Sequence, residues 1–320
     1  MNGQDRLAHF PITFFASVMG VVGLSIAWQR AEAVFLPLRG VGEALLWLGW
    51  GIFLLVAALY LFKALRHREE VVQEFNHPVR ANFFATIPIS MMLLSIATGH
   101  RWIGLSESLW VAGAGIQIIF TVLLVGRWLT RSFELPQVNP AWFLPAVGNI
   151  IAPLGAVEWG YTELGWFYFS VGLFFWLLLC ATIMQRLMFG VNLPEKLQPT
   201  FFILIAPPAV GFLSYVRLTA ATGLDPFSRL LFYVACFFAI LLLSLGFRFC
   251  RLPFYMSWWA FTFPFCALSI AATTVNRLAG GTVFSILATL CLGMATVIVA
   301  GVLARTLMGA YRSQICRPEE

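Results

Sequence analysis

Hydroxyl and amide side chains are the polar groups that lie inside the long apolar stretches of this sequence. Such groups donate hydrogen bonds that can stabilise a partly hydrated anion and still let it leave. Backbone groups freed where a helix is broken would join them. The candidates for lining a path through the protein are Thr13, Ser17, Thr86, Ser90, Asn149 and Thr262.

Titratable side chains, by contrast, are missing from the centre of every long apolar stretch. A carboxylate or histidine there would mark a proton relay or an ion-coupled pump. The four histidines, His9, His67, His77 and His100, lie at or near predicted loops, which argues against haem ligation and against an intramembrane metalloprotease. The six cysteines are scattered without CxxC spacing. We therefore expect no metal site, no cofactor and no enzymatic activity.

The composition places the chain in a membrane. Of the 320 residues, 60% are hydrophobic and only 11% are charged, and the mean hydropathy is +0.86. A soluble domain carries about 25% charged residues. The apolar stretches are mostly long enough for helices that cross a hydrocarbon core, and the alternating pattern of a β-barrel is absent. The sequence therefore predicts an all-α integral membrane protein.

Charged and turn-rich breaks divide the chain into ten predicted spans within a single transmembrane domain, residues 1–320. We expect both termini on the cytoplasmic side, because this assignment places 14 of the 20 Lys and Arg residues there. The predicted spans are 10–28, 41–65, 81–99, 105–128, 141–158, 164–188, 199–220, 227–249, 255–275 and 281–308.

Interior prolines occur only in odd-numbered spans. The third, fifth, seventh and ninth spans contain Pro88, Pro145, Pro207 and Pro264, and the first carries Gly20 and Gly23 instead. A broken helix is tolerated in a membrane where its backbone is buried in protein or lines a water-filled cavity. The pattern favours five helical hairpins, each with one kinked and one regular helix, in which the kinked helices surround a central pore. The alternative is that proline and glycine are simply frequent in membrane helices, as packing kinks.

A phenylalanine stands beside the proline of the ninth span, in the stretch "WWAFTFPFCA". If Pro264 bends this helix, the side chain of Phe263 can project toward the axis of the ring of helices. A bulky apolar ring in a narrow pore blocks ions sterically and by dewetting. The chain has 31 phenylalanines, however, and the position of Phe263 beside a proline does not by itself assign it a special role.

Four phrases resemble the TehA/slow-type anion channel family, which includes bacterial tellurite-resistance proteins, plant guard-cell anion channels and fungal malate and sulfite transporters. They are "HPVRANFFATIPISMMLL", "NPAWFLPAVGNIIAPLGA", "LIAPPAV" and "WWAFTFPF". The resemblance implies a homotrimer in which each subunit has its own pore, formed by five hairpins in a quasi-five-fold array. It also implies that Phe263 occludes the pore. Two departures are Val18, where some members have proline, and Ala16, where some have glycine.

The leading hypothesis is a trimeric anion channel of the bacterial inner membrane that passes small monovalent anions such as chloride or nitrate. Its partners would be these inorganic anions and the lipid bilayer, and we expect no nucleic acid. The main alternative is a secondary carrier or exporter of dicarboxylate, sulfite or tellurite. A membrane enzyme or scaffold is a third alternative, and it predicts no flux at all.

Overall fold

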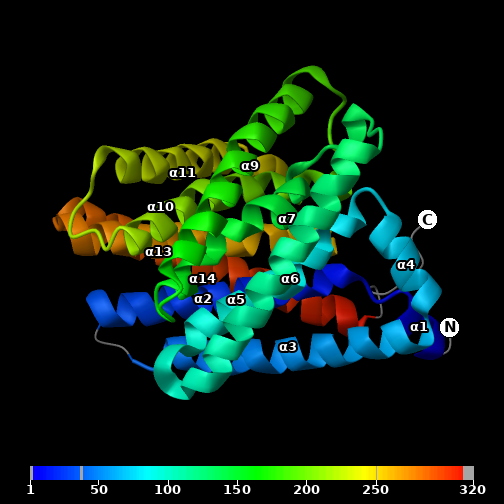
Figure 1. Ribbon diagram of the computed structural model, residues 1–320, viewed down its shortest axis with the longest axis horizontal. Helices are drawn as coiled ribbons and strands as arrows, with labels where there is room; N and C mark the ends of the chain where they lie inside the picture. The colour runs from blue at the N-terminus through cyan, green and yellow to red at the C-terminus, as the bar shows by residue number, and fades with distance from the viewer. Residues whose placement is uncertain (1–2, 37–38, 250, 313–320) are drawn as a thin grey trace.

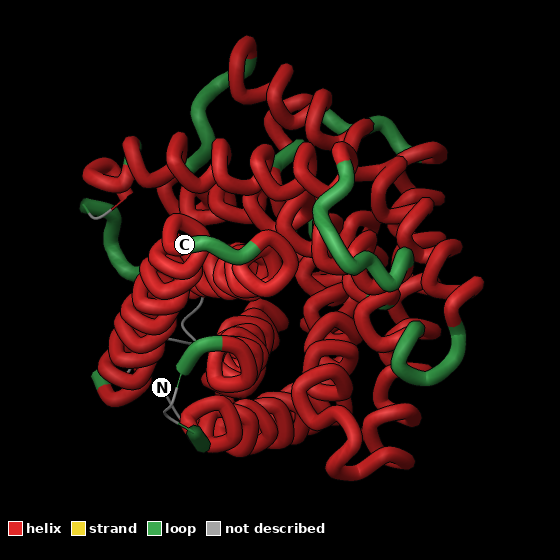
Figure 2. Tube along the Cα trace, turned by 90° about the vertical axis from the view of Figure 1, so that its left-hand side faces the viewer, coloured by secondary structure: helices red, strands yellow, loops and turns green. Residues whose placement is uncertain are grey.

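The computed structural model describes residues 3–36, 39–249 and 251–312, and every regular element in that part of the chain is a helix. Figure 1 shows the elements in chain order, and Figure 2 shows several helices nearly end-on, packed side by side. The α-helices are α1 Gly3–Ala8, α2 Phe15–Val34, α3 Val41–Arg66, α4 Arg68–Asn76, α5 Thr86–Thr98, α6 Ile103–Thr130, α7 Phe143–Val147, α8 Pro153–Ala156, α9 Thr162–Phe189, α10 Ala206–Leu218, α11 Pro226–Ser244, α12 Gly246–Phe249, α13 Thr262–Ala279 and α14 Thr282–Tyr311.

Short 3₁₀ helices precede or connect many of these α-helices. A 3₁₀ helix is wound more tightly than an α-helix and rarely exceeds about four residues. Three of those in this protein, η2, η7 and η8, are longer. The 3₁₀ helices are η1 Ile12–Phe14, η2 Arg80–Ala85, η3 Gly99–Trp102, η4 Leu135–Gln137, η5 Pro140–Trp142, η6 Gly148–Ile151, η7 Glu195–Ile205 and η8 Met256–Phe261.

Eight helical stretches in the described part of the chain are long and apolar enough to cross a membrane, in agreement with the predicted multi-pass membrane protein. One of them, Arg80–Thr130, is 51 residues long and contains both α5 and α6. The predicted spans 81–99 and 105–128 therefore fall within one stretch. The predicted span 141–158 corresponds to a shorter apolar run, Pro140–Ala156, which is divided among several short helices. The count of ten crossings stays a prediction.

Helices that follow one another in the chain pack as neighbours. Contacts join α2 to α3, α5 to α6, α10 to α11, and α13 to α14. The short helices α7, η6 and α8 together contact α9 in the same way. The first members of these pairs also contact one another. Helix α2 contacts α5, and α5 contacts both η6 and α8. Both η6 and α8 contact α10, which contacts α13, and α13 contacts α2. The contacts close a ring. We call these five stretches, each taken with the 3₁₀ helix before it, the inner segments.

Burial separates the inner segments from the helices outside them. The most apolar windows of Ile12–Val34, Glu195–Leu218 and Met256–Ala279 are 72–83% buried, whereas those of α3, α9, α11 and α14 are 22–39% buried. The outer helices expose large apolar side chains such as Phe174 and Leu290. A helix that exposes such residues over most of its surface is suited to contact with lipid.

The prolines of four inner segments lie in the first turn of an α-helix, directly after a 3₁₀ helix, and one of them is Pro145, the third residue of the short helix α7. Pro88 is the third residue of α5, Pro207 and Pro208 are the second and third of α10, and Pro264 is the third of α13. Proline is tolerated in a first turn because its missing N–H is not needed there for an α-helical hydrogen bond. At these prolines the structure shows a change from 3₁₀ to α geometry.

The inner segment around Pro145 is the most broken, and α6 supplies partners for its backbone. Thr121 Oγ1 and Gln117 Nε2 donate hydrogen bonds to the carbonyl oxygen of Pro145, at 2.6 and 3.0 Å. The indole N–H of Trp110 donates to the carbonyl oxygen of Ala152 at 2.9 Å. Because lipid offers no hydrogen bonds, a broken helix can stay in a membrane only with such support from its neighbours.

The glycines of α2 permit close packing against α13, and the hydrogen-bonded helix continues through both of them. A Cβ atom at Gly20 would clash with the side chain of Thr262. A Cβ atom at Gly23 would lie 3.1 Å from Cδ2 of Phe263 and 3.2 Å from Cβ of Cys266. The helix is therefore not interrupted at either glycine, and in this structure the two residues let two inner segments approach each other.

A buried ion pair fixes the start of the first inner segment. Lys63 Nζ lies 2.9 Å from Glu74 Oε2, and the two side chains are only 4% and 3% exposed. Glu74 Oε1 accepts a hydrogen bond from the backbone N–H of Ile12 at 2.8 Å, and Lys63 donates to the carbonyl oxygen of Phe10 at 2.8 Å. Tyr60 also donates to Glu74, at 3.0 Å. Helix α4 is thereby attached to η1.

We expect Thr121→Val to lower the free energy of unfolding by about 1 kcal/mol, because the carbonyl oxygen of Pro145 loses a donor in a setting without water. Thr289→Val is the matched control, since the hydroxyl of Thr289 donates only within its own helix, to Ser285. The measurement is SDS-induced unfolding in mixed micelles, followed by tryptophan fluorescence. Equal losses in the two variants would contradict this role of α6.

We expect Glu74→Gln to cost about 3 kcal/mol of stability, because it leaves the buried ammonium group of Lys63 without a counter-charge. Glu69→Gln, at an exposed position of the same helix, should change little. The double variant Lys63→Met with Glu74→Leu should recover only part of the loss. It removes both charges, but it leaves the N–H of Ile12 and the carbonyl oxygen of Phe10 without these partners. The same unfolding assay tests all three, and a Glu74→Gln protein as stable as the Glu69→Gln protein would disprove the interpretation.

Candidate functional site

A narrow cavity of about 60 Å³ lies between the five inner segments. A buried water needs about 10–15 Å³ on such a measure, so the cavity has room for only a few waters. Every inner segment contributes to its wall. The lining residues are Thr13, Ala16 and Met19; Phe83, Thr86 and Ile89; Phe143, Leu144, Val147, Gly148, Ile150 and Ile151; Ile203, Ala206, Pro207 and Val210; and Met256, Ser257, Trp259, Ala260, Phe263 and Pro264.

Many of the lining residues follow one another at intervals of three or four in the sequence. Side chains three residues apart are aligned along a 3₁₀ helix, and those three or four apart lie on one face of an α-helix. These inner segments therefore turn a ridge of side chains toward the cavity, across the change from 3₁₀ to α geometry. The clearest ridges are Thr13, Ala16 and Met19; Phe83, Thr86 and Ile89; Ile203, Ala206 and Val210; and Ser257, Ala260 and Phe263.

The cavity wall is almost entirely apolar, and none of the described residues that line it is charged. Its side-chain hydroxyl groups belong to Thr13, Thr86 and Ser257. The hydroxyl of Thr86 donates to the carbonyl oxygen of Phe83 at 2.6 Å, whereas the buried hydroxyl of Ser257 has no hydrogen-bond partner in the described part of the chain. A narrow apolar passage with few dipoles resists wetting, and it offers a passing ion weak interactions only.

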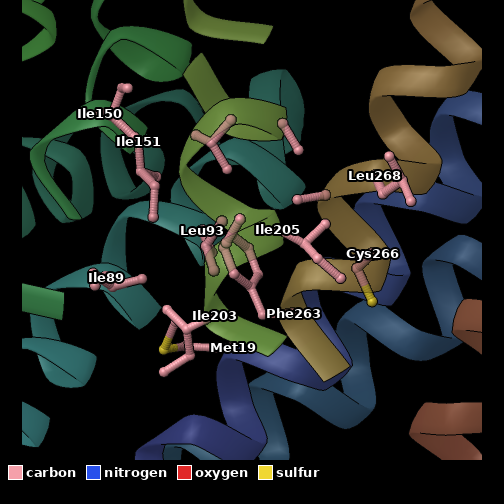
Figure 3. Packing of buried hydrophobic residues seen from close by; sticks show 14 of the residues in the cluster. Met19, Ile89, Leu93, Ile150, Ile151, Ile203, Ile205, Phe263, Cys266 and Leu268 are labelled. Carbon is pink, nitrogen blue, oxygen red and sulfur yellow. The ribbon is translucent and has the colours of Figure 1, made fainter. Parts of the chain in front are cut away.

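Phe263, the predicted gate, is buried in this wall. Figure 3 shows its side chain among apolar side chains of other segments, including Met19, Ile89 and Ile203, which line the same cavity. Its ring also lies against Gly23 of α2, where any larger residue would press on it. The aromatic ring thus occupies the space between inner segments that are distant in the sequence.

Four of the six predicted polar candidates lie outside this cavity wall, and each is bonded to its surroundings. Ser17 Oγ donates to the carbonyl oxygen of Phe14 at 2.6 Å, and Ser90 Oγ to that of Thr86 at 2.7 Å. Asn149 Nδ2 donates to Thr121 Oγ1 at 2.8 Å, and Thr262 Oγ1 to the carbonyl oxygen of Trp259 at 2.7 Å. Only Thr13 and Thr86 of the six line the cavity.

One kind of hydrogen bond recurs in every inner segment. A polar side chain donates to the backbone carbonyl oxygen three residues before it, in or near the stretch where 3₁₀ geometry changes to α. Side chains that bond back in this way satisfy their own donor groups within the segment, and the carbonyls of Phe83 and Trp259 also accept the backbone N–H of the same residue. The five pairs are Ser17 with Phe14, Thr86 with Phe83, Asn149 with Ala146, Thr200 with Leu197, and Thr262 with Trp259.

The predicted proline positions divide in the same way, because Pro207 and Pro264 line the cavity while Pro88 and Pro145 do not. Two contributors were not expected from the sequence: Ser257 in the cavity wall and Gln117 on α6. The sequence does contain a signal for Gln117: it is an amide in an apolar span without interior proline, and the next span is broken by proline. Such an amide is a candidate donor to the broken backbone. No comparable signal marks Ser257, since its exposure to the cavity depends on the rotation of η8.

Arginines gather near the C-terminal ends of three inner helices. Arg30 of α2 lies within electrostatic range of Arg217 of α10 and Arg277 of α13, and also of Glu158. Glu158 pairs with Arg217 at 2.9 Å and with His100 at 3.0 Å. Positive side chains at helix C-termini complement the helix dipole. Within this group the three arginines outnumber the single carboxylate, and a local excess of positive charge attracts anions.

The chain matches a family model described as SLAC1, voltage-dependent anion channel, over residues 9–307. It is 32% identical over 313 residues to the S-type anion channel SLAH2 of Arabidopsis thaliana, covering 95% of this chain and 60% of that protein. It is 28% identical over 282 residues to the tellurite resistance protein TehA homolog of Haemophilus influenzae, covering 86% and 85%.

A third relative is the guard cell S-type anion channel SLAC1 of Arabidopsis thaliana, 26% identical over 325 residues, which cover 98% of this chain and 58% of that protein. The chain thus spans about three fifths of the length of these two plant relatives. The family match extends from before the first inner segment to the last turns of α14. The chain therefore belongs to the SLAC1/TehA family.

Proposed function

We propose that this protein is an anion channel that passes small monovalent anions, such as chloride and nitrate, through the cavity between its inner segments. The observation that carries the proposal is the cavity itself: all five inner segments line it, its described lining residues are uncharged, and Phe263 is part of its wall. Phe263 is the gate of the proposed channel. With the ring in place, the remaining space is too narrow and too apolar for a hydrated ion.

The proposed membrane topology has ten crossings, arranged as five hairpins in a quasi-five-fold array. In it α5 and α6 each cross the membrane once, and the broken run Pro140–Ala156 crosses as the partner of α9. The closed ring of contacts among the inner segments supports this arrangement. In this arrangement, the buried segments that contain 3₁₀ helices surround the path of the anion, and the regular helices face the lipid.

Conduction in this proposal depends on weak interactions. Arginines at the end of the inner bundle raise the local anion concentration, and no cation among the described lining residues holds an anion that enters. The hydroxyls of Thr13 and Ser257 replace part of the lost hydration, whereas the hydroxyl of Thr86 already donates to Phe83. Binding that is weak at every point allows rapid exit, which is the condition for a channel.

We further propose that the protein resides in the inner membrane of a bacterium, with both termini in the cytoplasm, and that it forms a homotrimer with a pore in each subunit. The distribution of Lys and Arg supports the orientation. The apolar faces of α3, α9, α11 and α14 supply the surface for lipid and for neighbouring subunits.

A secondary carrier is the second candidate. The name of one relative refers to tellurite resistance. Under the carrier hypothesis, such resistance would result from export of tellurite. A carrier binds its substrate in one state and releases it in another, and its flux saturates. The lack of a charged or titratable side chain among the described residues that line the cavity favours the channel.

We expect Phe263→Ala to raise the anion current severalfold or more, because it removes a bulky ring from the wall of the narrow cavity and so widens it. The measurement is current through purified protein in planar bilayers, with chloride and then nitrate. Phe261→Ala is the matched control, since Phe261 lies two residues away, packs on Phe202 and Phe249, and does not line the cavity.

Two results would oppose this gate. Equal currents through the Phe261→Ala and Phe263→Ala proteins would mean that loosened packing opens the path. A membrane-inserted Phe263→Ala protein without any current would remove the channel proposal. Uptake of malate or sulfite into proteoliposomes would then be measured, and a saturable, proton-driven flux would favour the carrier.

We expect Arg277→Gln to reduce the chloride conductance of the open Phe263→Ala channel by about twofold at low salt, and to have little effect at about 1 M salt, where the Debye length is about 3 Å. Arg229→Gln is the control, because Arg229 is an exposed arginine on the outer helix α11. A reduction that persists at high salt, or one that both variants share, would argue against an electrostatic role of the arginines near Arg30.

A further inference from the structure

A second cavity, of about 210 Å³, lies outside the inner ring, between the α4–η2 connection, the last turns of α6 and the loop after α6. Its wall includes two arginines, Arg127 and Arg131, together with polar side chains such as Gln137, and none of its described lining residues is a carboxylate. From this arrangement we propose that the cavity is a binding site for a phosphate group. We call it the Arg127 pocket.

The guanidinium group of Arg127 is held in place by α4. Its Nη1 donates a hydrogen bond to the carbonyl oxygen of Phe75 at 2.8 Å, and the group lies 4.2 Å from the centre of the Phe75 ring. One nitrogen is therefore committed to the protein, and the N–H groups of the others remain for a ligand. A guanidinium group fixed in this way is organised for binding phosphate before the ligand arrives.

Arg131 follows Arg127 by four residues, and both side chains line the pocket at the end of α6. Neither arginine forms an ion pair within the residues that the structure describes. Two like charges at this spacing repel each other. An anion with two or more oxygens bound between them removes the repulsion and accepts hydrogen bonds from both, as a phosphate does.

Other parts of the pocket wall are fixed by their own contacts. The indole of Trp128 stacks on that of Trp142, with ring centres 4.8 Å apart and planes 9° from parallel. Asn82 is fixed as well, because its Nδ2 donates to the carbonyl oxygens of Pro78 and Val79. A pocket that is already shaped and whose walls do not rearrange loses little entropy when it binds a small ligand.

Arginines at the ends of membrane helices also follow the general bias of cytoplasmic charge, without any ligand. That bias explains positive charge on this side of the protein. It does not explain why two arginines share one pocket that has room for a phosphate and no carboxylate among its described lining residues. The shared pocket favours a ligand.

The same 3₁₀ helix borders both cavities. Ala81 and Asn82 of η2 line the Arg127 pocket, while Phe83 and Thr86, near the end of η2 and at the start of α5, line the cavity between the inner segments. A ligand in the Arg127 pocket therefore lies against the same 3₁₀ helix that forms part of the cavity wall. The binding site itself does not depend on ion conduction, and it is testable in a protein that conducts nothing.

The test uses the full chain in nanodiscs of phosphatidylcholine, titrated with inorganic phosphate in an isothermal calorimeter. We expect a dissociation constant of about 1 mM or tighter, and binding at least about tenfold weaker in Arg131→Gln. Arg66→Gln should bind like the wild type, because Arg66 is an exposed arginine outside the pocket whose guanidinium group lies 4.8 Å from the centre of the Phe62 ring. Unfolding midpoints check that both variants are folded.

Nanodiscs that contain phosphatidic acid distinguish the source of the phosphate. If the lipid headgroup fills the pocket, the wild type in these discs no longer binds inorganic phosphate. If the headgroup stays outside the pocket, binding of inorganic phosphate remains. Either result supports the site. No binding of phosphate by the wild type in phosphatidylcholine discs would overturn it, and so would equal weakening by Arg66→Gln and Arg131→Gln.

Discussion

The structure depends on one constraint, which is that lipid cannot hydrogen-bond to a peptide group. Broken segments with polar side chains must therefore satisfy both their backbone and their side-chain groups within the protein. This protein meets the constraint in two ways. A serine, threonine or asparagine bonds back to the carbonyl three residues earlier in every inner segment, as Thr86 does to Phe83. Where the backbone is most broken, α6 contributes Gln117 and Thr121 from outside. The outer helices therefore complete the inner ones as well as covering them.

The same constraint governs the placement of charge. The buried pair of Lys63 and Glu74 lies beside the start of the first inner segment, and the arginines around Arg30 lie near the helix C-termini. Between these ends, the described residues of the cavity wall carry no charge. An anion that enters the cavity would meet weak dipoles only, so its passage would be limited by the width of the cavity and by the loss of its hydration.

Sequence patterns predicted the larger features and missed the finer ones. Hydropathy identified a multi-pass helical membrane protein, and the prolines of the seventh and ninth spans marked two of the most buried stretches. Polarity alone did not separate Thr13, which lines the cavity, from Ser17 and Thr262, which bond back to their own segments. That distinction depends on helix rotation, which a single sequence does not encode in its composition. Glu74 stood in a charged run typical of a solvated loop, yet its partner Lys63 draws it into the interior.

The spacing of three residues along the inner segments has a consequence for the width of the passage. Three residues advance an α-helix by about 4.5 Å and a 3₁₀ helix by about 6 Å, so the lining side chains form successive tiers along the bundle axis. The middle tier holds small residues such as Ala16 and Ala206, and the next holds the larger Met19, Ile89 and Phe263. Each of these ridges contributes about one side chain to a tier of the cavity wall. A single substitution therefore changes one side of one tier and leaves the side chains of the other ridges as they are.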